Sequence, residues 1–376
     1  MREVRVGVRV MILLASVVCA TSLARAQTPM TDQNKDGGTA AQAPTRPTPP
    51  PAPLAKPKIQ RWFDLQTASL QARYRYVETS KGLVASDQAQ DSIALKARVK
   101  FDAKGKYSVN AGAATGTSFT GGWNNTGIGT GGLITNMYLK QLFLAAAPIK
   151  GLDLSYGGLA FVRGDSTEIT SYDNDGYLVG ARVSVKRPKD LYLDEITFTS
   201  GYLGDLNQPS FLDRYSRLDE VNYRHFLVGK RFGKSVSASA DYTRLSGVGT
   251  FRTAVNAKTP KAGVIDFVRY EQYRRTGPKA DFGYAVYAEK AVVKRFSLGL
   301  GYADIDPNYG GLNADRFNKG RRIFEQATLK VLRDLTVSAF LTQAVNNPFA
   351  VSNKQRVDIV AAYNVLGPIQ RAGYFR

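Results

Sequence analysis

Polar and apolar side chains alternate along most of the chain. Between Ile93 and Phe101 every odd position is apolar, and Lys96, Arg98 and Lys100 stand at even positions between them. Successive side chains of a β-strand point to opposite faces, so this run places an apolar surface on one face and a row of cations on the other. The run therefore predicts a strand with one apolar and one charged face.

The same alternation recurs from one end of the chain to the other. It is found in segments 70–76, 177–186, 236–243, 335–342 and 356–365. Glycine and aromatic residues are frequent, with 35 Gly, 20 Tyr and 18 Phe, whereas Met and Trp number only four and two. This composition favours strands and turns over long helices. We therefore expect an all-β protein.

Alternation alone does not decide which face meets water. A soluble barrel buries its apolar face, whereas a membrane barrel turns that face toward lipid and its polar face toward the lumen. Strands of about ten residues fit a tilted crossing of a bilayer. Tyrosines also gather near the predicted strand ends, where amphipathic rings favour the membrane interface; they are Tyr74, Tyr76, Tyr202, Tyr242, Tyr302 and Tyr363.

Short and long connections alternate as well. Short turns are predicted at 103–106, 148–151, 187–190, 233–234 and 333–334, and long polar or glycine-rich stretches at 118–135, 163–175, 205–220, 306–319 and 346–353. Outer-membrane barrels have this asymmetry, with tight periplasmic turns and longer external loops. The fold class we predict is a transmembrane antiparallel up-and-down β-barrel of about 16 strands, within a range of 14 to 18. The number sixteen requires Gly249–Asn256 to be a strand of its own.

The first 26 residues have the pattern of a secretory signal peptide. Arg2, Arg5 and Arg9 precede the apolar run Val10–Val18, and Ala24-Arg25-Ala26 fits a small-x-small cleavage site. Cleavage would remove the only cysteine, Cys19. Lipidation of Cys19 is the competing interpretation, although Val18 stands where such signals carry a small residue.

Residues 27–60 are rich in proline and contain few apolar side chains. We expect a disordered periplasmic segment that acts as a spacer, and a ligand for a periplasmic partner is the alternative. The alternating segments begin at Arg61. The predicted organisation is therefore a signal peptide at 1–26, a Pro-rich tether at 27–60 and an outer-membrane barrel at 61–376.

The chain is strongly basic but not very apolar. It has 376 residues, 43% of them hydrophobic, and a formal net charge of +20. The mean hydropathy of −0.25 excludes a bundle of membrane-spanning helices. The cations sit on alternate strand positions and in turns instead of along one helix, so a nucleic-acid partner is not expected. We expect some surface cations to meet lipopolysaccharide phosphates.

Several stretches resemble Gram-negative outer-membrane porins, including the porin-like and alginate-export-like families. They are MYLKQLFLAAAPIKGLDLSYGGL from Met137, RGDSTEITSYDNDGYLVGARV from Arg163 and GYADIDPNYGGLNADRF from Gly301. The resemblance implies a channel-forming barrel in the outer membrane. The C-terminus departs from the pattern, because many such proteins end in an aromatic residue and here Phe375 is followed by Arg376. We expect a last strand at Lys354–Leu366, followed by a short tail.

If the apolar faces meet lipid, the charged residues of the other faces line a pore. The predicted pore-lining residues are Arg73, Arg75, Lys96, Arg98, Lys100, Asp153, Arg182, Lys186, Glu195, Asp241, Arg322, Lys330, Arg356 and Asp358. Cations outnumber acids in this set, which favours anions in the pore. The alternative is that neighbouring charges neutralise one another and only keep the interior wet.

One long connection carries an unusual density of charge. Porins have a constriction loop, and by resemblance a loop folded into the barrel would narrow the opening here; its candidate residues are Arg163, Asp165, Glu168, Asp173 and Asp175. A solvated external loop is the alternative. Asp173-Asn174-Asp175 and the run Asp304, Asp306, Asn308 with Asn313 and Asp315 carry oxygen ligands suited to calcium. Neither has a complete calcium-loop spacing, and we expect no metal or other cofactor.

An enzyme is not expected. His225 is the only histidine and stands near no recognisable nucleophile motif, so we expect an interfacial or structural role for it. The glycine-rich segment ending at Gly132 lacks the Lys-Ser/Thr ending of a phosphate-binding loop, and we expect a flexible external loop there.

The function that these features predict is passive diffusion of small hydrophilic solutes across the outer membrane, with weak anion selectivity. A structural or adhesive barrel with a plugged lumen is the alternative. Outer-membrane lipid, lipopolysaccharide and the diffusing solutes are the expected partners, and both a monomer and a homo-oligomer remain open.

Overall fold

The computed structural model describes residues 62–116, 121–171, 177–186, 192–204, 210–259, 263–277, 281–306, 319–345 and 353–374. The predicted signal peptide and the Pro-rich segment 27–60 lie outside the described residues. What is described consists mainly of strands joined by turns, with two short helical segments.

The strands alternate with the turn signals noted in the sequence. They are β1 (Phe63–Thr79), β2 (Val84–Lys100), β3 (Tyr107–Thr115), β4 (Asn124–Gly129), β5 (Met137–Ala146), β6 (Leu152–Ala160), β7 (Tyr177–Lys186), β8 (Glu195–Tyr202), β9 (Tyr223–Phe232), β10 (Val236–Leu245), β11 (Val248–Lys258), β12 (Phe267–Thr276), β13 (Asp281–Val293), β14 (Phe296–Ile305), β15 (Gly320–Lys330), β16 (Leu335–Ala344) and β17 (Asn353–Asn364). The helical segments are η2 (Phe211–Arg217) and α2 (Leu366–Arg371).

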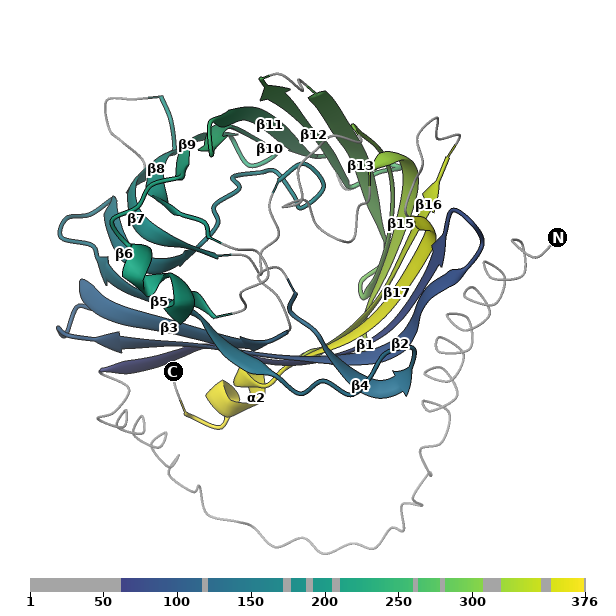
Figure 1. Cartoon of the computed structure of the whole chain (residues 1–376), viewed down its shortest axis with the longest axis horizontal. Helices are drawn as coiled ribbons and strands as arrows, with labels where there is room; N and C mark the ends of the chain where they lie inside the picture. The colour runs from purple at the N-terminus through teal and green to yellow at the C-terminus, as the bar shows by residue number, and fades with distance from the viewer. Residues whose placement is uncertain are drawn as a thin grey trace, which may run out of the picture. The chain divides into compact units, whose positions relative to one another are not determined.

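Sixteen of these strands form a closed antiparallel ring (Figure 1). Each of the sixteen pairs with the strand before it and the strand after it in the ring. The one irregularity is that β3 pairs directly with β5, because β4 lies outside this order and pairs with residues 88–91 of β2. Pairing of β1 with β17 closes the ring. The predicted up-and-down barrel of sixteen strands is confirmed, and β11 contains the segment Gly249–Asn256 on which that number depended.

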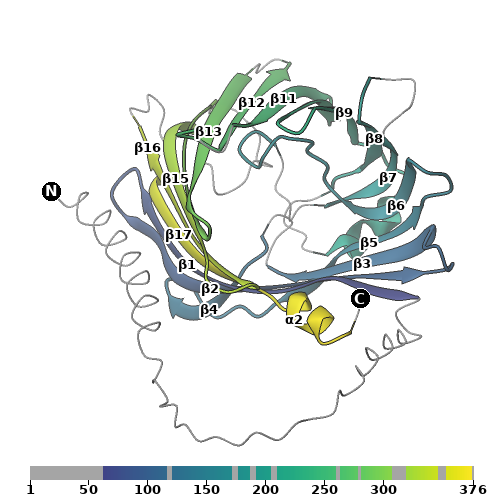
Figure 2. The same cartoon turned by 180° about the vertical axis from the view of Figure 1, so that it is seen from behind.

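The connections divide between the two ends of the ring, which Figures 1 and 2 show from opposite sides. The edge with the turns at 101–106, 147–151, 233–235, 294–295 and 331–334 also holds the start of β1 and the helix α2. The connection that contains β4, the connection after β6 and the connection that contains η2 leave the other edge. The asymmetry predicted from the sequence is thus present, although the turns 80–83 and 246–247 at the second edge are also short.

The two faces of the ring carry opposite chemistry. Leu95, Leu300 and Phe282 are exposed by 40%, 57% and 49%, whereas Arg322, Arg356 and Asp241 are almost fully buried on the other face. This is the inverse of a soluble barrel, and it suits a wall with lipid outside and polar groups inside. Strand pairing satisfies the main-chain groups of that wall without water.

Three local expectations were wrong. The glycine-rich segment is not simply a loop, because Asn124–Gly129 forms β4 and pairs with β2. Tyr177 shares the face of exposed Val183, yet it is fully buried, because η2 packs against β7 and Arg214 of η2 donates to the Tyr177 hydroxyl. Beyond β17 the chain forms α2 instead of extending the strand to Leu366.

Candidate functional site

All fourteen residues predicted to line a pore lie on strands β1, β2, β6, β7, β8, β10, β15 and β17, on the face opposite the exposed apolar side chains. On β10, for example, Asp241 lies between Ala240 and the exposed Tyr242 and points to the opposite face. Alternation therefore places them together on the inner wall. Their role in conduction remains a prediction.

The inner wall of β1 and β17 holds a cluster of arginines around one carboxylate, in the half of the barrel away from the start of β1. Asp358 accepts a hydrogen bond from Nε of Arg75 at 3.0 Å, and from Nε and Nη2 of Arg356 at 3.0 and 2.6 Å. Arg75 and Asp358 are direct cross-strand partners. With Arg322 on β15, these described side chains carry three positive charges and one negative charge.

Arg73 extends this cationic surface and contacts the segment that precedes β4. Its Nε donates to Oε1 of Gln90 at 2.9 Å, and its guanidinium carbon lies 4.0 Å from the centre of the Trp123 ring. Gln90 in turn donates to Oδ1 of Asn125 at 2.8 Å. The glycine-rich segment thus brings Trp123 to the inner wall, which its composition did not predict.

Closer to the edge that holds the start of β1 and the turns 101–106 and 147–151, the cations of the inner wall have acidic partners. Asp64 accepts from Arg98 and from Nζ of Lys100, the latter at 2.8 Å. Lys186 lies 2.7 Å from Asp153 across the β6–β7 pair. Opposite charges are therefore locally matched toward the short-turn edge.

The connection after β6 binds to the inner wall of β10 to β12. The backbone N–H of Asp165 donates to Oγ of Ser239 at 2.7 Å, and its carboxylate accepts from Ser237 at 3.1 Å and from Asn256 at 2.8 Å. These wall residues alternate with exposed apolar ones, so the segment lies inside the ring.

Glu271 on β12 is the second anchor of this segment. Its carboxylate accepts from the backbone N–H of Thr167 at 2.7 Å, from the Thr167 hydroxyl, and from the Thr170 hydroxyl at 2.5 Å. Glu271 is almost fully buried. A buried carboxylate is stable only when its oxygens are hydrogen-bonded, so the wall and the segment require each other here.

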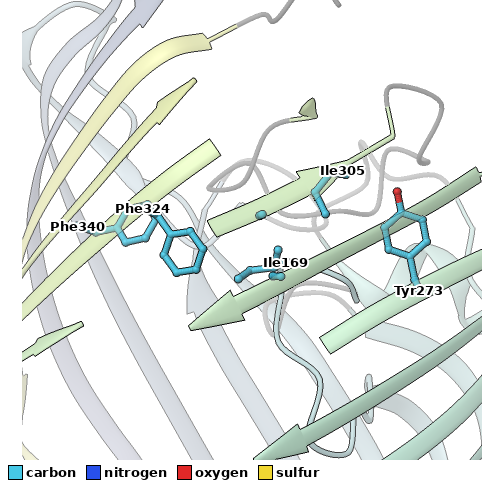
Figure 3. Packing of buried hydrophobic residues seen from close by; sticks show 7 residues of the cluster. Ile169, Tyr273, Ile305, Phe324 and Phe340 are labelled. Carbon is cyan, nitrogen blue, oxygen red and sulfur yellow. The ribbon is translucent and has the colours of Figure 1, made fainter. Parts of the chain in front are cut away.

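Ile169 supplies an apolar anchor (Figure 3). It is buried with Tyr273, Ala285, Ala303, Ile305, Phe324 and Phe340. The Phe324 ring lies across Gly301, where an added Cβ would be 2.1 Å from a ring carbon, so only glycine lets the ring lie flat on the wall. An apolar patch on an otherwise polar inner wall is thus covered by the segment.

A brace between β9, β10 and β11 completes the attachment. Nη1 of Arg252 donates to Asp241 at 2.9 Å, and Nε of Arg252 donates to the carbonyl oxygen of Thr170 at 2.8 Å. Nε2 of His225 lies 3.4 Å from the same Asp241 carboxylate. His225 is buried on the inner wall, so of the two roles expected for it the interfacial one is wrong and the structural one fits.

A polar hollow of about 360 Å³ lies beside the anchored segment. It is lined by Gly164, Asp165, Lys186, Asp194, Glu195, Leu227, Gly229, Lys230, Arg231, Ser237 and Ser239. Most of these residues belong to the halves of β7 to β10 that lie nearest the turn 233–235. Space of this kind can hold water and small polar molecules between the segment and the short-turn edge.

The sequence-predicted loop residues fall into two groups. Arg163, Asp165 and Glu168 belong to the anchored segment, whereas Asp173 and Asp175 lie outside the described residues. Asp304 and Asp306 are described, but Asn308, Asn313 and Asp315 of the calcium expectation are not.

Sequence reasoning missed Arg252 and Glu271, which hold the segment in place. Arg252 lies in Gly249–Asn256, the short segment on which the predicted strand number depended. Glu271 lies in the stretch 264–274, where polar side chains such as Glu271 and Gln272 occupy both odd and even positions and hide the inner face. The alternation of Arg252 with exposed Phe251 and Val255 was a usable signal for the first.

Within the described ranges, no group of three His, Cys, Asp or Glu side chains is placed to hold a metal ion. The same part of the chain contains no helix with the length and apolar character needed to cross a membrane.

Comparisons with known proteins identify the fold. No family model matches the chain, and no curated protein does. The structure of Salmonella typhi OmpF in complex with daunomycin is similar, with a TM-score of 0.52 and 12% identity, over 82% of this chain and 99% of that one. A mutant of the Rh. blastica porin gives a TM-score of 0.53 and 12% identity, over 80% and 99% of the two chains. At such low identity the similarity shows a porin-like fold.

Proposed function

We propose that this protein is a porin-like channel of the outer membrane, through which small hydrophilic solutes diffuse passively. The observation that carries the proposal is the segment anchored across the inner wall at Asp165 and Ile169, with a polar hollow of about 360 Å³ beside it. A segment held in this way narrows a pore without filling it. The apolar outer face supports placement in a bilayer.

Weak anion selectivity is the finer part of the proposal. The described cluster of Arg75, Arg322, Arg356 and Asp358 has a positive balance, and Arg73 adds to it. A cationic stretch lowers the free energy of an anion relative to a cation in a low-dielectric channel. No catalytic role or cofactor is proposed.

Liposome swelling tests the channel. Vesicles containing the refolded protein should swell in isotonic arabinose and more slowly in larger sugars, because the narrowed lumen sieves by size. Absence of swelling for every sugar would contradict the proposal. In planar bilayers with a salt gradient, the reversal potential should have the sign of chloride preference.

A filled structural barrel is the second candidate. The burial of Arg252, Arg322 and Arg356 favours it, since side chains this enclosed leave no open water around them. Swelling distinguishes the two candidates, because a filled lumen passes no solute.

A further inference from the structure

Two arginines stand side by side on the apolar outer face. Arg224 on β9 and Arg244 on β10 are direct cross-strand partners, and both are exposed. They share this face with Phe226 and Tyr242, which are also exposed. Each lies one residue from the end of its strand, at the edge of the ring that carries the turn 246–247 and the connection containing η2.

Within the described ranges, this pair of like charges has no acidic partner. Directly opposed side chains have Cβ atoms about 4.5 to 5.5 Å apart, and like charges at that distance destabilise the sheet. Among the residues that the structure describes, neither guanidinium takes part in an ion pair or hydrogen bond. Arg321, an exposed arginine at the same edge, has its Nε 3.2 Å from Asp304. An external anion bound between Arg224 and Arg244 would therefore reduce the repulsion between the two guanidinium groups.

Beside the pair, two side-chain hydroxyl groups lie on the same face of the wall. Arg244 is the cross-strand partner of Gly249, and Gly249 is the partner of Thr276. A Cβ at Gly249 would lie 2.4 Å from the Tyr242 hydroxyl and 2.6 Å from Oγ1 of Thr276. The Tyr242 hydroxyl thus reaches over Gly249, next to Arg244. Two guanidinium groups and a hydroxyl are suited to a tetrahedral phosphate.

Below the pair, aromatic side chains cross the outer face. Five of six consecutive cross-strand partners on β8 to β13 are exposed aromatic residues, and the sixth is Arg274; the row is Phe198, Phe226, Tyr242, Phe251, Arg274 and Phe282. Aromatic rings on this face favour the region where headgroups meet acyl chains. An anion bound by Arg224 and Arg244 would then have hydrocarbon directly beneath it.

We propose that Arg224, Arg244 and the Tyr242 hydroxyl form a binding site for the phosphate groups of lipopolysaccharide in the outer leaflet. This inference rests on the proposed outer-membrane location. Charge complementarity selects a phosphate, and the aromatic row selects one attached to a lipid over free phosphate in solution. Guanidinium groups bind phosphate oxygens in pairs, which lysine cannot reproduce.

Titration of the full chain in detergent with purified rough-type lipopolysaccharide, followed by native mass spectrometry, tests the site. The double variant Arg224→Ala/Arg244→Ala should bind about tenfold more weakly or worse, because losing one charge-assisted hydrogen bond already corresponds to a factor of that size. Arg321→Ala is the matched control and should bind as the wild type does. Chemically dephosphorylated lipopolysaccharide should bind the wild type as weakly as intact lipopolysaccharide binds the double variant.

Unchanged affinity in the double variant overturns the proposal, and so does equal binding of the dephosphorylated lipid. Displacement of the lipid by inorganic phosphate at similar concentration would show a free-anion site instead. Heat-dependent mobility on gels checks that the variant barrel is folded; if it is not, Arg224→Lys/Arg244→Lys replaces it and should bind with intermediate affinity. Vesicle swelling is measured separately, so a failed channel and a failed lipid site remain distinguishable.

Discussion

Single positions on this wall are defined by the face they occupy. Val286 at the middle of β13 is exposed on the apolar face, between Tyr270 and Tyr302 of the neighbouring strands. Gln326 on β15 lies on the inner face, next to Thr328. The two environments differ in solvent, so the same new side chain should have different consequences at the two positions.

A cation on the outer face should destabilise the barrel. Val286→Arg is expected to lower the free energy of unfolding by roughly 2 to 4 kcal/mol, the cost of Arg on the lipid face near the midplane, because neither cross-strand partner of Val286 carries a charge. The inward control Gln326→Arg should change it by less than half as much. Urea unfolding in lipid vesicles measures both, and equal losses would contradict the assignment of faces.

One acidic residue already occupies the apolar face. Glu325 is exposed there, and its cross-strand partners are Leu300 and Leu341. Replacing it with leucine should raise the free energy of unfolding by about 1 kcal/mol or more, because a carboxylate in lipid costs somewhat less than a cation. The same unfolding assay gives the value, and a loss of stability would mean that Glu325 is not in contact with lipid.

At the scale of elements, segments outside the strands are held by a few polar contacts. The segment 161–171 depends on Asp165, Ile169 and Glu271, and α2 depends on an ion pair to the β15–β16 turn. Each contact can be removed without touching strand pairing.

Glu271→Ala should release the anchored segment. Its Thr167 and Thr170 donors would lose their acceptor, at a cost of about 1 to 3 kcal/mol for each buried group left unpaired. We expect larger and noisier single-channel conductance, and faster proteolysis between 161 and 171. Gln272→Ala on the outer face of the same strand is the control and should leave the conductance unchanged.

The attachment of α2 should depend on pH. Asp334 in the β15–β16 turn accepts a hydrogen bond from Nη1 of Arg371 at 3.0 Å. This hydrogen bond and the charge of Arg371 lower the pKa of Asp334 below its ordinary value. Because the pKa of Asp334 is lowered, the ion pair stabilises the attachment of α2 fully at pH values above about 4, the ordinary pKa of an aspartate. This stabilisation is lost as the pH falls through the lowered pKa of Asp334.

Hydrogen exchange of α2 measures this effect. Exchange of the amides of residues 370–372, which lie in the last turn of α2, should be slow at pH 7 after correction for intrinsic rates and should accelerate below about pH 4. In Asp334→Asn it should be fast at both values. A helix protected equally at pH 3 and pH 7 in the wild type would show that the ion pair does not hold it.

At the largest scale, the inner face of the described barrel has an uneven distribution of charge. Asp64 and Asp153 pair with Lys100 and Lys186 near the edge that holds the start of β1. Nearer the opposite edge, the single carboxylate of Asp358 is surrounded by an excess of cations, namely Arg73, Arg75, Arg322 and Arg356. The arginine cluster around Asp358 should therefore dominate ion selectivity.

Neutralising part of that cluster should shift selectivity toward cations. Arg73→Gln/Arg75→Gln removes two positive charges and leaves Asp358 paired with Arg356. The reversal potential in a salt gradient should move toward that of a cation-selective pore, whereas Arg321→Gln on the outer face should leave it in place. An unmoved potential in the double variant would mean that ions pass elsewhere or not at all.

Strand number, faces and the two classes of connection could be predicted from the sequence alone. They follow from a local rule, since a period of two sets the face of every residue in a strand wherever the strand begins. For the same reason Arg98 and Arg356 could be assigned to the inner face before any pairing was known.

Only the tertiary structure decided which distant residues meet there. The contact of Thr167 with Glu271 joins positions 104 residues apart, and its partners come from strands whose proximity depends on closure of the whole ring. Likewise, Trp123 beneath Arg73, η2 over Tyr177 and the unpaired neighbours Arg224 and Arg244 depend on register and on loop paths. No local pattern encodes these, because each depends on pairings between segments far apart in the chain.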